Sequence, residues 1–125
     1  MLTEINTGDY TIRGASLGGL YTALHVPQLD SLFDAGLAIR RGATASRLFL
    51  SHAHLDHIGA LPSLLGMRGM IAGGDYPPLD LYCPHGIEGD LRSALDSLSA
   101  LHHWPLKVNM ISMRPGEQVH LKGQL

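Results

Sequence analysis

Apolar and polar residues follow two periodicities along the chain, and together they predict strands interleaved with helices. Alternation or short apolar runs predict strands at residues 10–15, 21–26, 31–35, 47–51, 80–83, 107–113 and 117–121. Apolar residues spaced three or four apart predict helices at residues 59–67 and 87–101. Glycine and proline residues fall between these segments and favour loops there. Strands mixed with two helices indicate layers of the α/β or α+β class.

Both predicted helices carry an apolar stripe that can pack on a sheet. The stripes are Ile58, Leu61, Leu64 and Leu65 in the first helix, and Ile87, Leu91, Leu95 and Leu98 in the second. Pro62 lacks a backbone N–H and is tolerated only in the first turn of a helix, so the first helix is expected to start late.

The bulk composition indicates one domain with its own core. The chain has 125 residues, of which 45% are hydrophobic, which suffices for one domain and not for two. Nine Lys and Arg residues stand against eleven Asp and Glu, and no basic patch typical of strong nucleic-acid binding is visible. Cys83 is the single cysteine, which excludes an internal disulfide and fits a reducing compartment.

The chain is expected to be a cytoplasmic protein with no membrane partner. Its first residues lack the basic and apolar regions of a secretory signal, and no apolar run is long enough to span a membrane. The last five residues stop in the middle of a pattern, with no closing helix or tail. We therefore expect one domain over residues 1–125 that is truncated at its C-terminus.

The most informative segment lies between the strand at residues 47–51 and the helix that follows it. His52, His54, Asp56 and His57 fall within six residues, in the pattern His-x-His-x-Asp-His. Imidazole and carboxylate groups are ligands that zinc and similar divalent ions accept. The pattern therefore predicts a metal-binding loop, against the alternative of a polar loop without metal. His85, His102, His103 and His120 are isolated or paired on surface-like segments and are expected to be solvated.

Several segments resemble the ribonuclease Z family of the metallo-β-lactamase superfamily, whose members cut the 3′ trailer from precursor tRNA. The matching segments are Ser-Leu-Gly-Gly at 16–19, Leu-Phe-Asp-Ala-Gly at 32–36, the metal loop with its flanks at 48–62, and Arg-Pro-Gly-Glu-Gln-Val-His-Leu at 114–121. The resemblance covers nearly the whole of this chain, but this corresponds to only about the N-terminal half of the family domain. It implies half of an αββα sandwich with a two-zinc site.

The resemblance also implies a role for individual residues. His52 and His54 match ligands of the first zinc, and Asp56 and His57 match ligands of the second. Asp56 is in addition the group that handles the proton of the attacking water. Asp34 matches an aspartate that supports the metal loop from behind, although it could instead cap a turn.

Gly18 and Gly19 form either a plain turn or a loop near a substrate phosphate. The family's three remaining ligands and its tRNA-binding arm are expected beyond the end of this chain. The resemblance therefore implies precursor tRNA as the partner of the intact protein, and little activity of this chain alone. Half of a sandwich leaves an apolar sheet face open, so association through that face, as a homodimer, is also expected.

Two alternatives remain at this point. Another hydrolase of the same fold, acting on thioesters, lactones or cyclic phosphodiesters, would share the metal motif. A non-catalytic zinc-binding or assembly module would fit the missing ligands.

Overall fold

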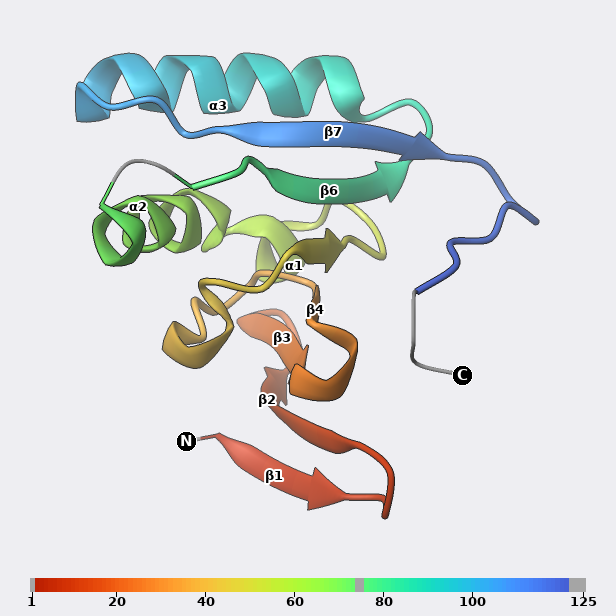
Figure 1. Cartoon of the computed structure of the whole chain (residues 1–125). Helices are drawn as coiled ribbons and strands as arrows, with labels where there is room; N and C mark the ends of the chain where they lie inside the picture. Colours follow the sequence, from red (N-terminus) through yellow and green to blue (C-terminus); the bar gives the residue numbers. More distant parts are fainter. Residues whose placement is uncertain (1, 74–75, 122–125) are drawn as a thin grey trace.

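The computed structural model of the protein describes residues 2–73 and 76–121. Its strands form one mixed sheet in which the order in space equals the order in the chain, β1-β2-β3-β4-β5-β6-β7. The strands are β1 (Thr3–Asn6), β2 (Thr11–Leu17), β3 (Tyr21–Val26), β4 (Ser31–Phe33), β5 (Arg47–Phe49), β6 (Leu79–Pro84) and β7 (Val108–Met113). Strands β1 to β4 pair antiparallel, and β4 to β7 pair parallel. Figure 1 shows this sheet running from β1 to β7.

The parallel half requires crossover connections, and helices provide two of them. The β5–β6 connection contains α1 (Leu55–Ile58) and α2 (Leu61–Ala72), and the β6–β7 connection contains α3 (Glu88–His102). Short 3-10 turns, η1 (Pro27–Leu29) and η2 (Arg40–Gly42), flank β4. Pro62 lies in the first turn of α2, and the helix ends at Gly73 in a left-handed conformation. None of the helices in the described ranges is long and apolar enough to cross a bilayer.

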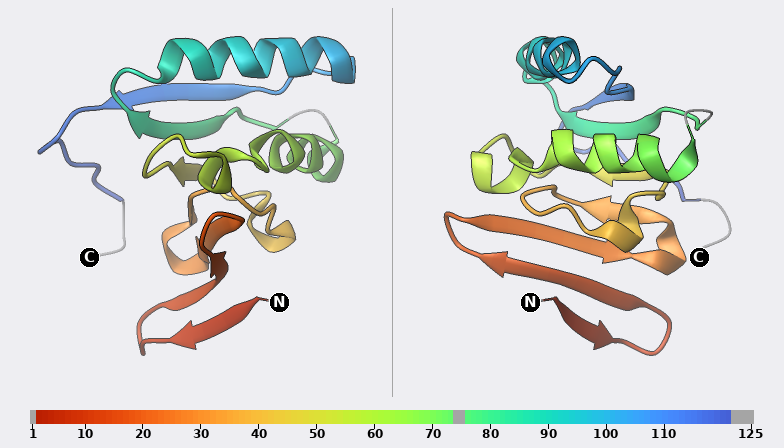
Figure 2. Two further views of the ribbon diagram at one scale, coloured as in Figure 1. Left: turned by 180° about the vertical axis from the view of Figure 1, so that it is seen from behind. Right: turned by 90° about the vertical axis from the view of Figure 1, so that its left-hand side faces the viewer.

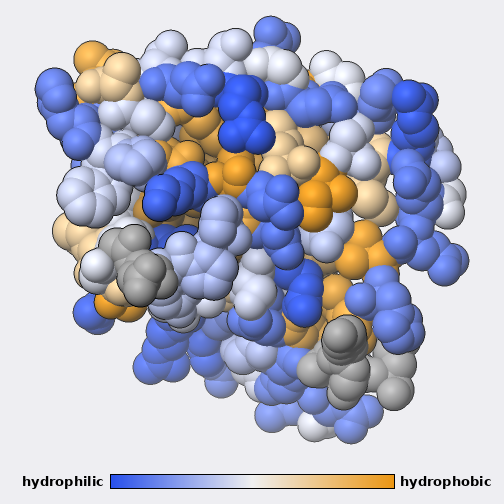
Figure 3. Space-filling view, turned by 45° about the horizontal axis from the view of Figure 1, so that its top comes forward, coloured by the Kyte–Doolittle hydropathy of each residue, from blue (hydrophilic) through white to orange (hydrophobic). Residues whose placement is uncertain are grey.

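The main core lies between one face of the sheet and the helices α2 and α3. Leu32, Leu48 and Leu81 stand in register on neighbouring strands and are fully buried. The helices cover them with apolar side chains, which are Leu61, Leu64 and Leu65 from α2 and Leu91 and Leu95 from α3. Figure 2 shows both helices beside the sheet. Figure 3 shows that the surface of the molecule seen in that view is mainly polar, with apolar residues visible between the polar ones.

The other face of the sheet carries a row of aromatic rings. Phe33, Phe49 and Tyr82 are in register, with ring centroids 5.3 Å apart for the first pair and 4.7 Å for the second. Leu24 on β3 and Ile111 on β7 extend the row at its two ends. All five side chains are only partly buried, because α2 and α3 pack on the opposite face.

The α/β class is confirmed, and most predicted strands appear within two residues of their expected bounds. The predicted strand at 117–121 is wrong, because no strand among the described residues pairs with this segment. The Glu117 N–H instead donates to the Arg114 carbonyl and closes a turn. Four elements were missed: β1, which is exposed throughout, the short helix α1, and the 3-10 turns η1 and η2. The helix predicted at 59–67 begins at Leu61 and extends to Ala72.

Candidate metal centre

The His-x-His-x-Asp-His segment leaves the carboxyl end of β5 and forms the start of α1. The ring centroids of His52 and His57 are 4.1 Å apart, and those of His52 and His54 are 4.6 Å apart. The His57 Nε2 atom lies 3.4 Å from an Asp56 carboxylate oxygen. The fold thus brings all four predicted ligands together at one edge of the sheet, where the parallel strands β4 to β6 also end.

Asp34 supports this loop from the end of the neighbouring strand β4. The residue is 8% exposed, and its side chain accepts three hydrogen bonds of 2.8 Å: from the Ser51 N–H, the Ser51 hydroxyl and the His57 Nδ1. A carboxylate only accepts, so His57 must carry its proton on Nδ1. The lone pair on the other nitrogen, Nε2, is then free for a metal ion, as in carboxylate–histidine–metal sites.

The backbone of the two residues after Asp34 contacts the same loop and fixes its position. The Ala35 N–H donates to the His57 carbonyl over 2.7 Å, and the Ala35 carbonyl accepts from the Ala60 N–H over 2.8 Å. Gly36 packs so tightly that a Cβ atom there would lie 1.7 Å from the Asp56 carbonyl oxygen. Only glycine fits this contact, so Gly36 determines how closely the loop approaches the sheet.

The donor set suits a zinc ion. Three imidazoles and one carboxylate are typical zinc ligands, and the hydrogen bond that His57 donates to Asp34 prepares one imidazole in the required tautomer. Within residues 2–73 and 76–121, no three His, Cys, Asp or Glu side chains stand in positions that would hold a metal ion. Binding of a metal ion would therefore require side chains of the loop to rotate, while the backbone of the loop is already anchored.

Comparison with known proteins places the chain in a family. A model described as the beta-lactamase superfamily domain matches residues 29–125, which is more than half of the chain. The chain belongs to this superfamily.

Curated relatives of this superfamily member carry ribonuclease Z names. The tRNase Z TRZ2, chloroplastic, of Arabidopsis thaliana is 34% identical over 117 residues, which are 94% of this chain and 32% of that protein. The tRNase Z TRZ1 of the same plant is 32% identical over 93% of this chain and 40% of its own length. The nuclear ribonuclease Z of Triticum aestivum is 31% identical over 93% of this chain and 64% of its own length. The chain thus spans between about one third and two thirds of these relatives.

The resemblance to ribonuclease Z drawn from the sequence is confirmed by these relatives. The prediction of a cytoplasmic location stays a prediction, since one relative's name places that protein in the chloroplast. The roles assigned to individual ligands likewise stay predictions.

Gly18 and Gly19, in the connection between β2 and β3, differ in their contacts. Gly19 has a φ of 78° and donates its N–H to an Asp56 carboxylate oxygen over 3.3 Å. The Leu20 N–H bonds to the Leu17 carbonyl, so the segment is also a regular turn. Gly18 has no atom within 4 Å of where a Cβ would lie. The turn therefore reaches the candidate metal loop through Gly19, and its role toward a substrate phosphate stays a prediction.

The remaining histidines lie outside the loop. The four that were predicted to be solvated are exposed, namely His85, His102, His103 and His120. His85 bonds the Ser112 hydroxyl over 3.0 Å and lies 3.5 Å from the Glu88 carboxylate. Glu88 accepts hydrogen bonds from its own backbone, from Ser112 and from the Gly86 N–H, and these lower the pKa of its carboxyl from 4.5 to about 2.

Proposed function

We propose that this chain forms part of the active site of a zinc-dependent ribonuclease Z that hydrolyses the phosphodiester bond at the 3′ trailer of precursor tRNA. The contact that carries the proposal is the hydrogen bond that the His57 Nδ1–H donates to the Asp34 carboxylate, behind the four-residue donor set. The relatives named ribonuclease Z support the same chemistry.

His52, His54, Asp56 and His57 would hold the metal. Zinc, when bound, lowers the pKa of a water molecule and stabilises charge that develops on a phosphate. The residues of the chain have separate tasks. Asp34 holds the tautomer of His57, the Gly19 N–H orients the Asp56 carboxylate, and Asp56 accepts the proton of the attacking water.

The four donors are fewer than two zinc ions require, because each ion is normally held by three or four protein ligands. Side chains from outside residues 52–57 must therefore complete the site. The described ranges offer no further His, Cys, Asp or Glu arranged with this loop to hold a metal ion. We accordingly propose that these residues alone bind zinc weakly and do not turn over precursor tRNA.

Zinc content tests the metal assignment. Elemental analysis of the purified chain should detect zinc in the wild type and none in the double variant His52→Ala/His54→Ala. The double variant His102→Ala/His103→Ala is the matched control, because it also removes two neighbouring histidines but lies outside the loop. Equal zinc content in all three proteins would rule out the metal loop.

A chimera tests the reaction. Residues 1–121 of this chain would replace the corresponding segment of an active ribonuclease Z, which supplies the remaining ligands. The chimera should release the 3′ trailer from precursor tRNA, and Asp56→Ala should abolish release. Cleavage by the unfused chain, lost in Asp56→Ala, would instead show that the site is complete within it.

We also propose that the aromatic face of the sheet associates with a second copy of the chain. Phe33, Phe49 and Tyr82 are stacked and only partly buried there, and large apolar patches on a surface favour association. Sedimentation velocity should show a dimer for the wild type and a monomer for Phe49→Asp. A wild type that stays monomeric at micromolar concentration would refute this proposal.

A further inference from the structure

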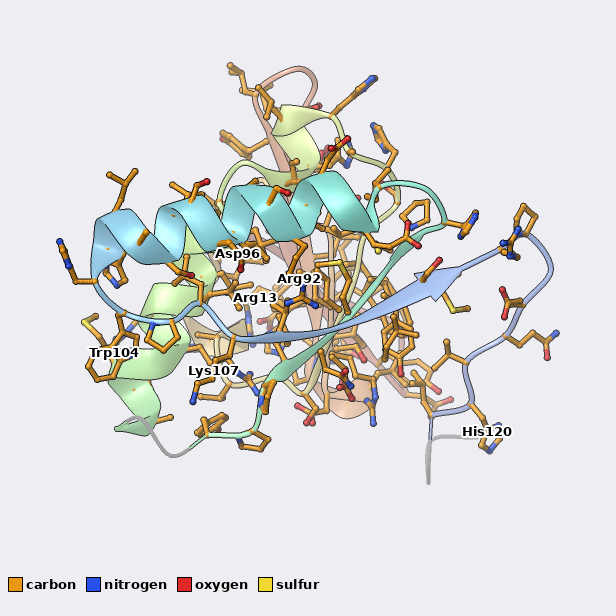
Figure 4. All side chains as sticks on the ribbon, turned by 90° about the horizontal axis from the view of Figure 1, so that it is seen from above. Arg13, Arg92, Asp96, Trp104, Lys107 and His120 are labelled. Carbon is orange, nitrogen blue, oxygen red and sulfur yellow. The ribbon has the colours of Figure 1, made fainter. Side chains whose placement is uncertain are left out.

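A groove lies between the C-terminal half of α2 and the segment that follows α3. It consists of two cavities of about 220 and 420 Å³, which share Gly69 and Trp104 as lining residues. Figure 4 shows Trp104 beside α2, with Lys107 on the segment that leads into β7. Trp104 and Lys107 precede β7, and Tyr76 precedes β6, whereas the candidate metal loop follows β5. The groove and the metal loop are therefore at opposite edges of the parallel sheet.

Two glycines on one side of α2 create the space for the groove. A Cβ atom at Gly69 would lie 3.4 Å from the Trp104 indole nitrogen, and one at Gly66 would lie 3.7 Å from the His102 Nε2 atom. Glycine is a poor helix former, so these positions do not serve helix stability. Trp104 remains 53% exposed, and a flat aromatic surface is thus available to a ligand.

The charged side chains that line the groove among the described residues are cations, in a chain whose net charge is −2. No carboxylate lines either cavity among the described residues, whereas Arg68, Lys107, His102 and His103 do. Arg68 is 5% exposed and donates to the carbonyls of Ala43, Ala45 and Pro77. Its guanidinium thus lies beneath the groove without a carboxylate contact in the described ranges, while Lys107 is exposed at the rim.

We propose that this groove binds single-stranded RNA, with a base stacked on Trp104 and a backbone phosphate held by the Lys107 ammonium. This rests on the proposed function, which makes RNA the substrate of the intact protein. Exposed aromatic rings beside cations and without carboxylates are the surface that single-stranded nucleic acids favour. The six residues of β6 separate the groove from the metal-loop edge by about 20 Å, so the bound segment is not the one that is cut.

Trp104 is the only tryptophan of the chain, and its fluorescence therefore reports on this groove alone. Titration with an oligouridylate or oligoadenylate of about eight nucleotides should quench it saturably. Anisotropy of the labelled oligonucleotide should show that Trp104→Ala weakens binding roughly tenfold or more, whereas Trp104→Phe largely preserves it. The phenylalanine variant guards against a folding defect in the alanine variant.

The charge part of the proposal is tested by salt dependence. Lys107→Gln should weaken binding and reduce the slope of log affinity against log salt by about 0.7, as expected for one lost phosphate contact. Arg92→Gln, which removes an exposed cation on α3 away from both cavities, should leave affinity and slope unchanged. An equal effect of the two variants would show non-specific attraction and would overturn the proposal.

Two further results separate the groove from the metal loop and from other occupants. His52→Ala/His54→Ala should bind the oligonucleotide as tightly as the wild type, even though it has lost zinc. Loss of RNA binding in that variant would overturn the proposal that the groove binds RNA and would favour the metal loop as the RNA contact. Fluorescence that responds only to a proline-rich peptide or to rising protein concentration, and not to RNA, would assign the groove to a peptide or to a second copy.

Discussion

Replacing Gly36 with alanine should damage the metal loop more than its size suggests. The added Cβ would lie 1.7 Å from the Asp56 carbonyl oxygen and 2.6 Å from the Thr22 backbone nitrogen, and both neighbours are backbone atoms that cannot rotate away. Overpacking of this kind typically costs about 1–3 kcal/mol. Moving the loop would also weaken the hydrogen bonds from Gly36 to Thr22 and from Ala35 to His57, at about 1 kcal/mol each.

The entropy that alanine removes from the unfolded chain offsets about 0.4–1 kcal/mol of this cost. A net destabilisation of about 3 kcal/mol remains, which corresponds to a drop in Tm of about 10 °C for a domain of this size. Zinc content should fall as well, because the Asp56 backbone must shift.

Gly89→Ala is the matched control for Gly36→Ala. A Cβ at this exposed position in α3 would meet nothing within 4 Å, so helix propensity alone acts and stabilises by up to about 1 kcal/mol. Thermal unfolding followed by circular dichroism should therefore give shifts of opposite sign for the two variants. If Gly36→Ala unfolds within a degree or two of the wild type and keeps its zinc, the tight seat under Asp56 does not exist in solution.

Two more changes test contacts at the same edge of the sheet. Asp34→Asn keeps a residue type that tolerates the φ of 63°, but the asparagine amide would donate to His57 and favour the wrong tautomer. Competition with a chelator should therefore show a zinc affinity about 10–100-fold lower. Unchanged affinity would mean that Asp34 only caps a turn. Glu88→Gln tests the lowered pKa: the ionised carboxylate stabilises the fold above the unfolded pKa near 4.5, and this is lost as pH falls toward about 2. Urea unfolding should thus show a gap between wild type and Glu88→Gln that closes on acidification, and a gap that is constant with pH would contradict the hydrogen-bond explanation.

The sequence predicted those parts of the molecule that depend on local pattern. The strand at 21–26 has the predicted bounds, and the metal motif lies after β5 and before a helix, as its apolar flanks indicated. The segment 117–121 alternates as a strand should, yet a strand also needs a partner, and periodicity cannot provide that information. The same limit applies to β1, whose exposed residues form a strand because β2 lies beside them.

Within the site, the sequence indicated which residues could bind metal but not what holds them. The support of the metal loop by Asp34 came only from resemblance, because Asp34 and His57 are 23 residues apart and meet through the pairing of β4 with β5. Nothing in the local pattern indicates that Gly36 packs against the Asp56 backbone or that the Gly19 N–H donates to the Asp56 carboxylate. Both could have been suspected only as glycines, the residue type that permits a close approach of the backbone.

The sequential order of the sheet has a consequence for how the protein folds. Every strand pairs with its neighbour in the chain, so each new strand can add to the edge left by the one before it, and the first four strands are joined by short loops. Gly19, Asp34 and Gly36, which anchor the metal loop, all precede it in the chain. During synthesis the anchors therefore emerge from the ribosome before the ligands that they position.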